Sequence, residues 1–379
     1  MQNNPNFPGR VEKLVSWLKK ESIDAVIIED SEGRRNTALR YFTGLPSDAL
    51  LFVFSAGKTI LVPWDILLAE RLAFADEVIP YNEFSRLPER AIPEVLRREG
   101  LGRDSIVEIS GNTPHLLYGD LSEKLKGRVL CRKEGLDRRI QSLRMRKEKE
   151  EIEFLQRAAE ITDRILDILE EGFRGGAFKS EIDVALTIET EARKMGAEST
   201  GFETLVAGSG RSFAIHPYPT YSGASVTAEG FNIVDFGVKF EGYTTDVTFT
   251  VFNGNPSAEQ KKMIRLVESS YELALSGCVA GTSCREIARR VDEFLKENDL
   301  NMPHGLGHGI GLEPHESPFL RNREDSETAL EPGMVITLEP GLYHPQWGGV
   351  RLENDILITE NTPRVLTSSR ILSVPLQNR

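Results

Sequence analysis

The chain has 379 residues, more than one hydrophobic core usually supports, so its length predicts two domains. Hydrophobic residues make up 40% and charged residues 27%, a mixture typical of globular proteins. The formal net charge of −12 repels phosphate backbones and anionic headgroups, which argues against nucleic acid or a membrane surface as a partner.

Neither a membrane span nor a secretion signal is visible in the sequence. The longest apolar run, residues 49–54, is far shorter than a bilayer span, and residues 1–10 lack the regions of a signal peptide. Cys131, Cys278 and Cys284 form no Cys-x-x-Cys pair, which argues against a disulfide framework or a structural zinc site. We therefore expect a cytoplasmic protein.

The first part of the chain alternates between helical and strand-like patterns. Apolar spacing predicts helices over residues 11–20 and 88–99 and strands over residues 24–28 and 105–108. Residues 49–54 and 59–62 flank Ala56-Gly57 and read as a hairpin. These patterns predict an α/β N-terminal domain, which we expect to cover residues 1–140.

The remaining residues, 141–379, are expected to form an α+β domain. The basic stretch 138–149 opens a long helix, and Gly172 is placed to end it. Three further helices begin at the N-cap pairs Ser180/Asp183, Ser257/Gln260 and Ser283/Glu286. The strand-like runs of this domain are residues 231–240, 243–252, 305–311, 334–338 and 350–358.

A glycine-rich segment carries two histidines, His304 and His308, within His-Gly-Leu-Gly-His-Gly-Ile-Gly. Because each interior glycine costs a helix about 1 kcal/mol relative to alanine, a helix is disfavoured. A strand would point His304, Leu306, His308 and Ile310 one way, and its glycine face would let another backbone approach closely. The alternative is a loop in which the histidines are incidental.

Four acidic residues lie in or beside apolar strand-like runs. Asp235 and Asp246 flank the Glu241-Gly242 turn signal, whose hairpin would hold two strands about 5 Å apart. Glu339 and Glu353 each end an apolar run, where a buried carboxylate is costly unless it is paired or bound to a cation. Taken singly, each could be an ordinary turn or strand-end acid.

Together, the four carboxylates and His308 suit two divalent metal ions about 3.5–4 Å apart. A zinc site of the His-Glu-x-x-His type is excluded, because no second histidine follows His315-Glu316 at that spacing. The sequence therefore predicts a dinuclear hydrolase.

The motifs also resemble a known family, the pita-bread metallopeptidases, which include Xaa-Pro aminopeptidases, prolidases and methionine aminopeptidases. The resemblance rests on segments 234–237, 243–248, 304–311, 315–316, 337–341 and 349–353, which occur in the family's order. The N-terminal part, with Tyr41-Phe-Thr-Gly44, is similar to the creatinase-like N-terminal domain, which favours the Xaa-Pro branch.

The resemblance implies a role for each matching residue. Asp235 would chelate one metal, Asp246 and Glu353 would bridge both, and His308 and Glu339 would bind the second. Glu339 would also be the general base. Further residues would act on the substrate or on the ligands, namely His315 at the scissile carbonyl, His216 and His304 on the substrate side, and Arg351 beside the bridging glutamate. Manganese is the expected metal, with cobalt or zinc as substitutes.

The implied reaction is hydrolysis of the bond between an N-terminal residue and a following proline, by a homodimer. Strict prolidases often carry a basic residue just after the His-Glu-x-Pro run, where this chain has Phe319, with Arg321 two residues on. Dipeptidase and aminopeptidase therefore both remain open. Two further hypotheses are a catalytically idle binding protein of this fold and a creatinase-like C–N hydrolase, although creatinases lack this ligand set.

Overall fold

The structure is a computed structural model that describes residues 5–125 and 127–376. The chain divides into two compact units, residues 1–144 and 145–379, and each is described by itself. Within the described residues, no helix combines the length and the apolar character that crossing a bilayer requires.

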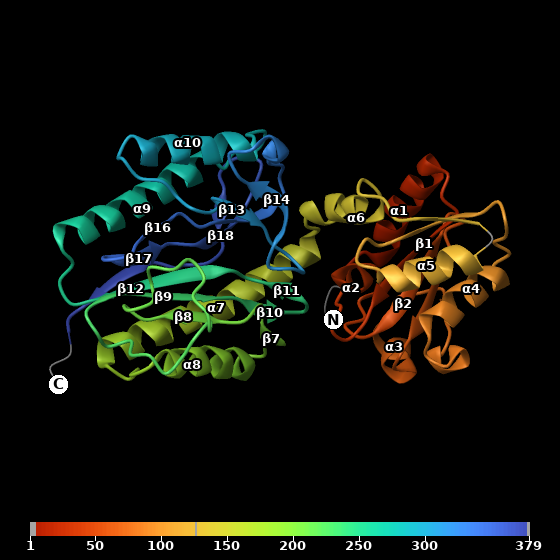
Figure 1. Ribbon diagram of the computed structural model, residues 1–379, viewed down its shortest axis with the longest axis horizontal. Helices are drawn as coiled ribbons and strands as arrows, with labels where there is room; N and C mark the ends of the chain where they lie inside the picture. Colours follow the sequence, from red (N-terminus) through yellow and green to blue (C-terminus); the bar gives the residue numbers. More distant parts are fainter. Residues whose placement is uncertain (1–4, 126, 377–379) are drawn as a thin grey trace. The chain divides into compact units, whose positions relative to one another are not determined.

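The first unit contains a mixed six-stranded sheet, in which Figure 1 labels β1 and β2. Its strand order is β4-β3-β2-β1-β5-β6. Its strands are β1 (Ala25–Asp30), β2 (Ala49–Phe54), β3 (Thr59–Pro63), β4 (Glu77–Val78), β5 (Ile106–Ile109) and β6 (Arg128–Leu130). The predicted hairpin is confirmed, because β2 and β3 pair in antiparallel fashion. In contrast, β5 runs parallel to both β1 and β6.

Helices complete the α/β architecture of this unit. They are α1 (Phe7–Glu21), α2 (Thr37–Thr43), α3 (Ile66–Leu72), η1 (Tyr81–Phe84), α4 (Pro88–Arg98), α5 (His115–Lys124) and α6 (Leu136–Met145), the last running just past the division. The predicted helix over residues 11–20 lies within α1, where Leu14 and Leu18 are fully buried. The apolar spacing that predicts this helix therefore also identifies its buried face.

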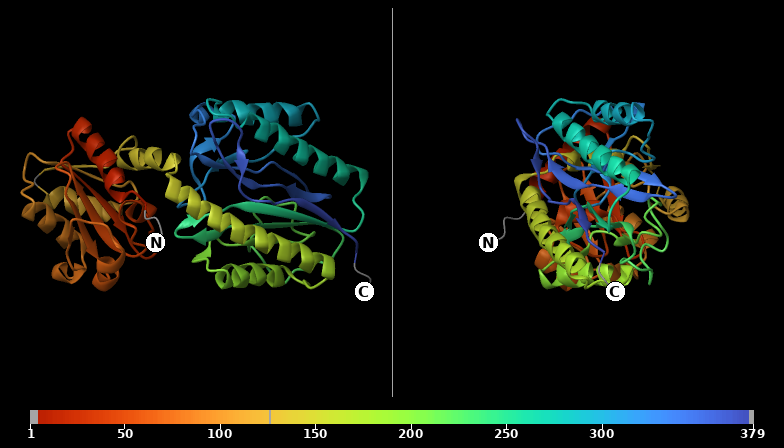
Figure 2. Two further views of the ribbon diagram at one scale, coloured as in Figure 1. Left: turned by 180° about the vertical axis from the view of Figure 1, so that it is seen from behind. Right: turned by 90° about the vertical axis from the view of Figure 1, so that its left-hand side faces the viewer.

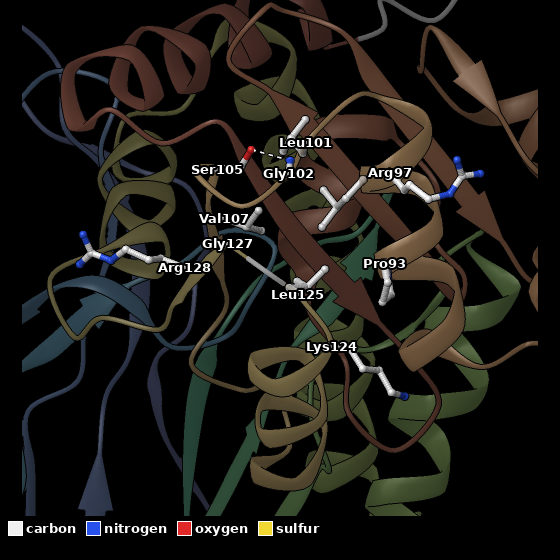
Figure 3. A pocket seen from close by; sticks show the side chains of 11 residues that line it. Pro93, Arg97, Leu101, Gly102, Ser105, Val107, Lys124, Leu125, Gly127 and Arg128 are labelled. Carbon is white, nitrogen blue, oxygen red and sulfur yellow. Dashed lines mark hydrogen bonds between the residues drawn. The ribbon is translucent and has the colours of Figure 1, made fainter.

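A cavity of about 320 Å³ lies in this unit beside α4 and β5. Its apolar wall includes Leu101, Val107 and Leu125, whereas the side chains of Arg97 and Arg128 extend away from it (Figure 3). Arg97 is moreover paired with Glu94 at 2.8 Å. The basic groups around this cavity therefore do not converge on a common point.

The second unit contains two main sheets, with the orders β20-β12-β9-β8 and β14-β13-β15-β18-β19, and two small ones. The strands of the first sheet are β8 (Leu205–Ala207), β9 (Gly230–Phe236), β12 (Val247–Asn253) and β20 (Ile371–Val374). Those of the second are β13 (Gly307–Gly309), β14 (Glu316–Leu320), β15 (Val335–Leu338), β18 (Asn354–Leu357) and β19 (Arg364–Val365). The small sheets contain β7 (Ser199–Thr200), β10 (Val238–Phe240), β11 (Tyr243–Thr244), β16 (Gly341–His344) and β17 (Gly348–Arg351).

Two pairs of helices cover these sheets from opposite sides (Figure 1, Figure 2). One pair is α7 (Lys149–Gly175) and α8 (Glu181–Lys194), and the other is α9 (Ala258–Gly277) and α10 (Cys284–Lys296), with η2 (Glu324–Ser326) in a loop. Each pair has its own hydrophobic core: α7 and α8 pack against β9 and β12, whereas α9 and α10 pack against β15 and β18. The polar site lies among the strands between these two cores.

Some helix boundaries differ from those expected. The long helix predicted to open in residues 138–149 is broken, because α6 ends at Met145 and α7 begins at Lys149. Gly172 does not end α7; it lies inside the helix, where the ring of Phe178 would come within 2.2 Å of an added Cβ. Gly176 ends α7 instead, since its φ of 67° is a left-handed conformation that glycine adopts without strain.

The predicted N-cap pairs are present in different degrees. Ser180 with Asp183 and Ser257 with Gln260 form reciprocal capping boxes at the starts of α8 and α9. Ser283 accepts a hydrogen bond from the backbone of Glu286, but the carboxylate of Glu286 pairs with Arg289.

Candidate metal centre

Two acidic residues reach the site from the first main sheet. Asp235 is the penultimate residue of β9, and Asp246 directly precedes β12. The strands are antiparallel, with Asp235 opposite Thr248. Between them, Glu241 and Gly242 take φ values of 48° and 84°, and this turn joins β10 to β11. The hairpin predicted from Glu241-Gly242 is therefore confirmed.

The other candidate ligands come from the second half of this unit. His308 is the central residue of β13, and Glu339 directly follows β15. Glu353 lies between β17 and β18 and forms a bridge to Thr248 of β12. This bridge places Glu353 next to β12 and therefore close to Asp235 and Asp246.

The glycine-rich segment forms a shorter strand than predicted. Only residues 307–309 are in β13, and the pairing with β14 shifts register after His308. The prediction that Leu306 points the same way as His304 and His308 is therefore wrong. Leu306 packs in the hydrophobic core, whereas both histidines line the cavity. The physical reason is that strict alternation holds only within a regular strand, and Leu306 lies outside it.

The close backbone approach expected of these glycines is confirmed. A Cβ added to Gly307 would lie 2.0 Å from the carbonyl oxygen of Thr337, and one added to Gly309 would lie 2.2 Å from that of Ser317. Any larger residue would push these neighbouring strands apart.

The five predicted ligands come together as overlapping groups. Asp235, Asp246 and Glu353 each place an oxygen within 4.8 Å of the others, and His308, Glu339 and Glu353 do the same with one ligand atom each. A third such group joins Asp246 and His308 to His315. Glu353, Asp246 and His308 therefore each belong to two groups.

The ring of His308 is oriented toward the carboxylates. Its Nδ1 lies 3.1 Å from the carbonyl oxygen of Gly309, which can only accept, so the proton sits on Nδ1. The lone pair of Nε2 then faces Asp246 Oδ2 at 3.8 Å and Glu339 Oε1 at 3.6 Å. Burial lowers the pKa of His308 to about 3, so the imidazole is neutral and able to bind a metal.

Three of the carboxylates, by contrast, resist ionisation when no cation is present. Burial, and next the charge of Glu353, raise the pKa of Asp246 and of Glu339 well above the usual range. Burial, followed by the charge of Asp235, raises the pKa of Glu353 to about 7. A divalent cation would supply the positive charge that lets these groups ionise together.

The hydrogen bonds of Asp235 give separate evidence that the site suits a cation. Its Oδ2 atom accepts a hydrogen bond from Arg351 Nη2 at 2.5 Å. Among the residues that the structure describes, no donor reaches its buried Oδ1 atom. An unsatisfied buried carboxylate oxygen is costly, and a metal ion would satisfy it, so the residues present fit a divalent ion.

A cavity of about 430 Å³ opens onto this cluster. All five candidate ligands line it, together with His315, predicted at the scissile carbonyl, and with His216 and His304, predicted on the substrate side. Arg351 does not line the cavity but holds Asp235 from behind. Burial is the main cause that lowers the pKa of His315 and of His216, which leaves both neutral near pH 7.

Sequence reasoning missed two residues of this site, Tyr343 and Thr248. Tyr343 receives a hydrogen bond from Arg351 Nη1 at 2.7 Å and lies 3.1 Å from His304 Nε2, so it joins the two. Thr248 accepts from Arg351 Nε and donates to Glu353 Oε2, both at 2.8 Å. Thr248 could have been found, because it lies two residues after Asp246; no sequence signal singles out Tyr343.

Comparison with known proteins agrees with this site. Residues 153–360 match the model of metallopeptidase family M24, and residues 10–146 match the creatinase/prolidase N-terminal domain. The chain is 32% identical over 366 residues to the Xaa-Pro dipeptidase of Pyrococcus furiosus, covering 95% of this chain and 98% of that protein. It is also 31% identical to an uncharacterized peptidase of Bacillus subtilis, with 95% and 98% covered.

Solved structures share both domains. The prolidase from Pyrococcus horikoshii superposes with a TM-score of 0.83 at 28% identity, covering 96% of this chain and 99% of that one. An X-Pro aminopeptidase from Thermotoga maritima gives the same TM-score at 27% identity, with 96% and 99% covered. The chain belongs to metallopeptidase family M24, and the predicted fold, a creatinase-like N-terminal domain followed by a pita-bread domain, is confirmed.

Proposed function

We propose that this chain is a Xaa-Pro dipeptidase that works with two divalent metal ions in the catalytic domain, residues 141–379. The observation that carries the proposal is the convergence of four carboxylates and one neutral imidazole in one cavity. The names of its relatives support the reaction, since the Pyrococcus furiosus and Pyrococcus horikoshii proteins are both called Xaa-Pro dipeptidases.

We assign Asp235 to one ion, His308 and Glu339 to the other, and Asp246 and Glu353 to both. Asp246 and Glu353 each belong to two ligand groups and have two carboxylate oxygens, which supports a bridging role, whereas His308 has only Nε2 facing the cluster. Four carboxylates balance the charge of two dications, and an oxygen-rich set with one imidazole suits Mn²⁺. We infer that manganese is the metal used, with Co²⁺ or Zn²⁺ as substitutes.

Two ions at this site would lower the pKa of a water molecule held between them and supply hydroxide near neutral pH. Glu339 lines the cavity and is the residue that would accept the proton of the attacking water. His315 is neutral, and its ring can donate a hydrogen bond to the oxygen of the scissile carbonyl as charge develops there.

The substrate side of the cavity contains His216, His304 and Arg321. His304 donates from Nδ1 to the carbonyl of Gly305 at 2.8 Å, and this bond fixes the orientation of its ring. Arg321 is exposed and lies over the ring of Phe319, 4.5 Å from its centroid, and no carboxylate in the described part of the chain pairs with it. Its guanidinium is therefore available to the terminal carboxylate of a dipeptide.

Paired substrates test this specificity. With Mn²⁺ added, the enzyme should hydrolyse Ala-Pro faster than Ala-Pro-Ala or Ala-Pro amide, which lack a carboxylate at that position. Replacing Arg321 should raise KM for Ala-Pro about tenfold or more and leave that for the amide nearly unchanged. Arg323→Met, in an exposed ion pair with Asp325, is the matched control. Equal rates on all three peptides would contradict the dipeptidase assignment. If none of the three peptides is hydrolysed, the proposed Xaa-Pro activity is wrong.

We also propose a cytoplasmic homodimer. Two of the three cysteines, Cys278 and Cys284, are buried free thiols, which suits a reducing compartment. The dimer rests on the family alone, and sedimentation of the purified protein tests it.

A further inference from the structure

A buried carboxylate joins the two ends of a loop that forms one wall of the cavity. Glu181, the first residue of α8, is fully buried. Its Oε1 accepts from the backbone of Gly208 at 2.8 Å, and its Oε2 accepts from the backbone and hydroxyl of Ser222, both at 2.7 Å. One side chain thus closes the segment 208–222, named here the His216 loop, into a compact Ω-type loop.

Arg211, inside this loop, completes the connection. Its Nη1 donates to Glu181 Oε2 at 2.5 Å and to Ser222 Oγ at 2.9 Å, and its Nη2 donates to the carbonyl of Pro219. The arginine side chain is 20% exposed and that of Glu181 is not exposed at all. A charged pair so largely removed from water, with several convergent hydrogen bonds, fixes geometry strongly.

The His216 loop lines part of the cavity and makes two hydrogen bonds to β17. His216 and Thr220 line the cavity. The carbonyl of Ile215, next to His216, accepts from Arg351 Nη1 at 3.3 Å, the arginine that also holds Asp235. Ser212 Oγ accepts from the backbone of Gly349 in β17 at 3.3 Å.

Apolar burial contributes little to the tip of this loop. Phe213 is 47% exposed and Tyr218 94% exposed, and they flank His216 on either side. Segments with few buried apolar contacts open at low free energy unless polar contacts hold them. The conformation of the loop therefore depends on Glu181 and Arg211 to an unusual extent.

We propose that Glu181 and Arg211 are a positioning pair, which holds His216 in place on the substrate side of the cavity. The pair touches neither the metal ligands nor the substrate directly; it acts through the loop. The inference rests on the proposed function, because it assigns His216 to substrate binding in that same reaction.

The kinetic test is a double-mutant cycle between Arg211 and His216. Arg211→Met should lower kcat/KM for Ala-Pro about tenfold or more, mainly through KM, with two metals still bound. In a His216→Ala background, the same substitution should change kcat/KM by less than about twofold. Arg157→Met, which removes an exposed ion pair with Glu160, is the control and should change neither kcat/KM nor KM for Ala-Pro. Multiplicative effects of Arg211→Met and His216→Ala would overturn the proposal.

Hydrogen exchange tests the pair without any substrate. In Arg211→Met, the amides of Gly208 and Ser222 should exchange faster, whereas those of α9 and α10 should not change. Unchanged exchange in the loop would reject the positioning role even if Xaa-Pro hydrolysis is confirmed. An inactive wild-type enzyme would reject only the proposed function. If Arg211→Met does not fold, Ser222→Ala, which removes the hydroxyl contacts alone, should give the same pattern at smaller amplitude, and no change there would count against the pair.

Discussion

Arg351 Nη2 donates a hydrogen bond to Asp235 Oδ2 at 2.5 Å, and only 2% of the arginine side chain is exposed. Because the second oxygen of Asp235 has no donor among the described residues, the arginine fixes the carboxylate and leaves this oxygen free to bind a metal. Arg351 therefore prepares the ligand without occupying the metal's position, as expected of a residue that orients ligands from behind.

Removing Arg351 should lower the free energy of unfolding more in the metal-free protein than in the metal-bound protein. Arg351→Met leaves Asp235, Thr248 and Tyr343 without a shared donor, and breaking a buried pair costs about 3–5 kcal/mol. Urea unfolding of the metal-free protein measures this loss. With metal bound, the loss should be smaller, because the ions neutralise Asp235. Equal losses in the two forms would contradict the orienting role.

Metal binding should release protons, and stabilisation by metal should grow with pH. The pKa of Glu353 is raised from 4.5 to about 7 in the folded, metal-free protein, so this form holds more protons than the unfolded chain between those values. The stability that Glu353 contributes to the metal-free protein is thus fully present below about pH 4.5 and is lost as the pH rises through 7. Metal ions replace the proton, which removes that loss.

Thermal unfolding with and without Mn²⁺ from pH 6 to 8 measures this dependence. His308 should not mask it, since its pKa of about 3 keeps the ring neutral throughout this range. The increase in Tm caused by Mn²⁺ should therefore rise with pH. A Tm increase that stays constant from pH 6 to 8 would show that the carboxylates are already ionised in the metal-free protein.

A buried ion pair next to the site should be essential for stability. Lys147 Nζ lies 2.7 Å from Glu316 Oε1, and the two side chains are 1% and 4% exposed. Lys147→Met should cost about 3–5 kcal/mol, because it leaves a buried carboxylate beside His315 without this partner. The exposed pair Arg285–Glu327 is the control, and Arg285→Met should cost less than about 1 kcal/mol. Similar losses in the two variants, measured by urea unfolding, would refute this difference.

The sequence singles out the candidate ligands because each one violates a local rule. The four acids Asp235, Asp246, Glu339 and Glu353 lie in or directly beside apolar strands, where an unpaired charge is costly, and all four line one cavity. Motifs in the family's order add what pattern alone does not provide, namely the reaction and the pairing of residues with roles.

Contacts set by tertiary packing could not be predicted in this way. Gly172 and Gly176 are equivalent as helix-ending signals, and the packing of Phe178 on Gly172 decides between them. Glu181 reads as an ordinary acid in the first turn of a helix, where such residues are common. Its connection to Gly208 and Ser222 depends on a loop that returns to the helix only in the folded chain.

Metal content measured together with activity tests the central claim most directly. Mass spectrometry of the Mn²⁺-loaded enzyme should find about two ions per chain, and Asp246→Ala should lose both metal and Ala-Pro hydrolysis, because this carboxylate belongs to two ligand groups. Full activity in a protein that holds no metal, or in Asp246→Ala, would contradict the dinuclear centre.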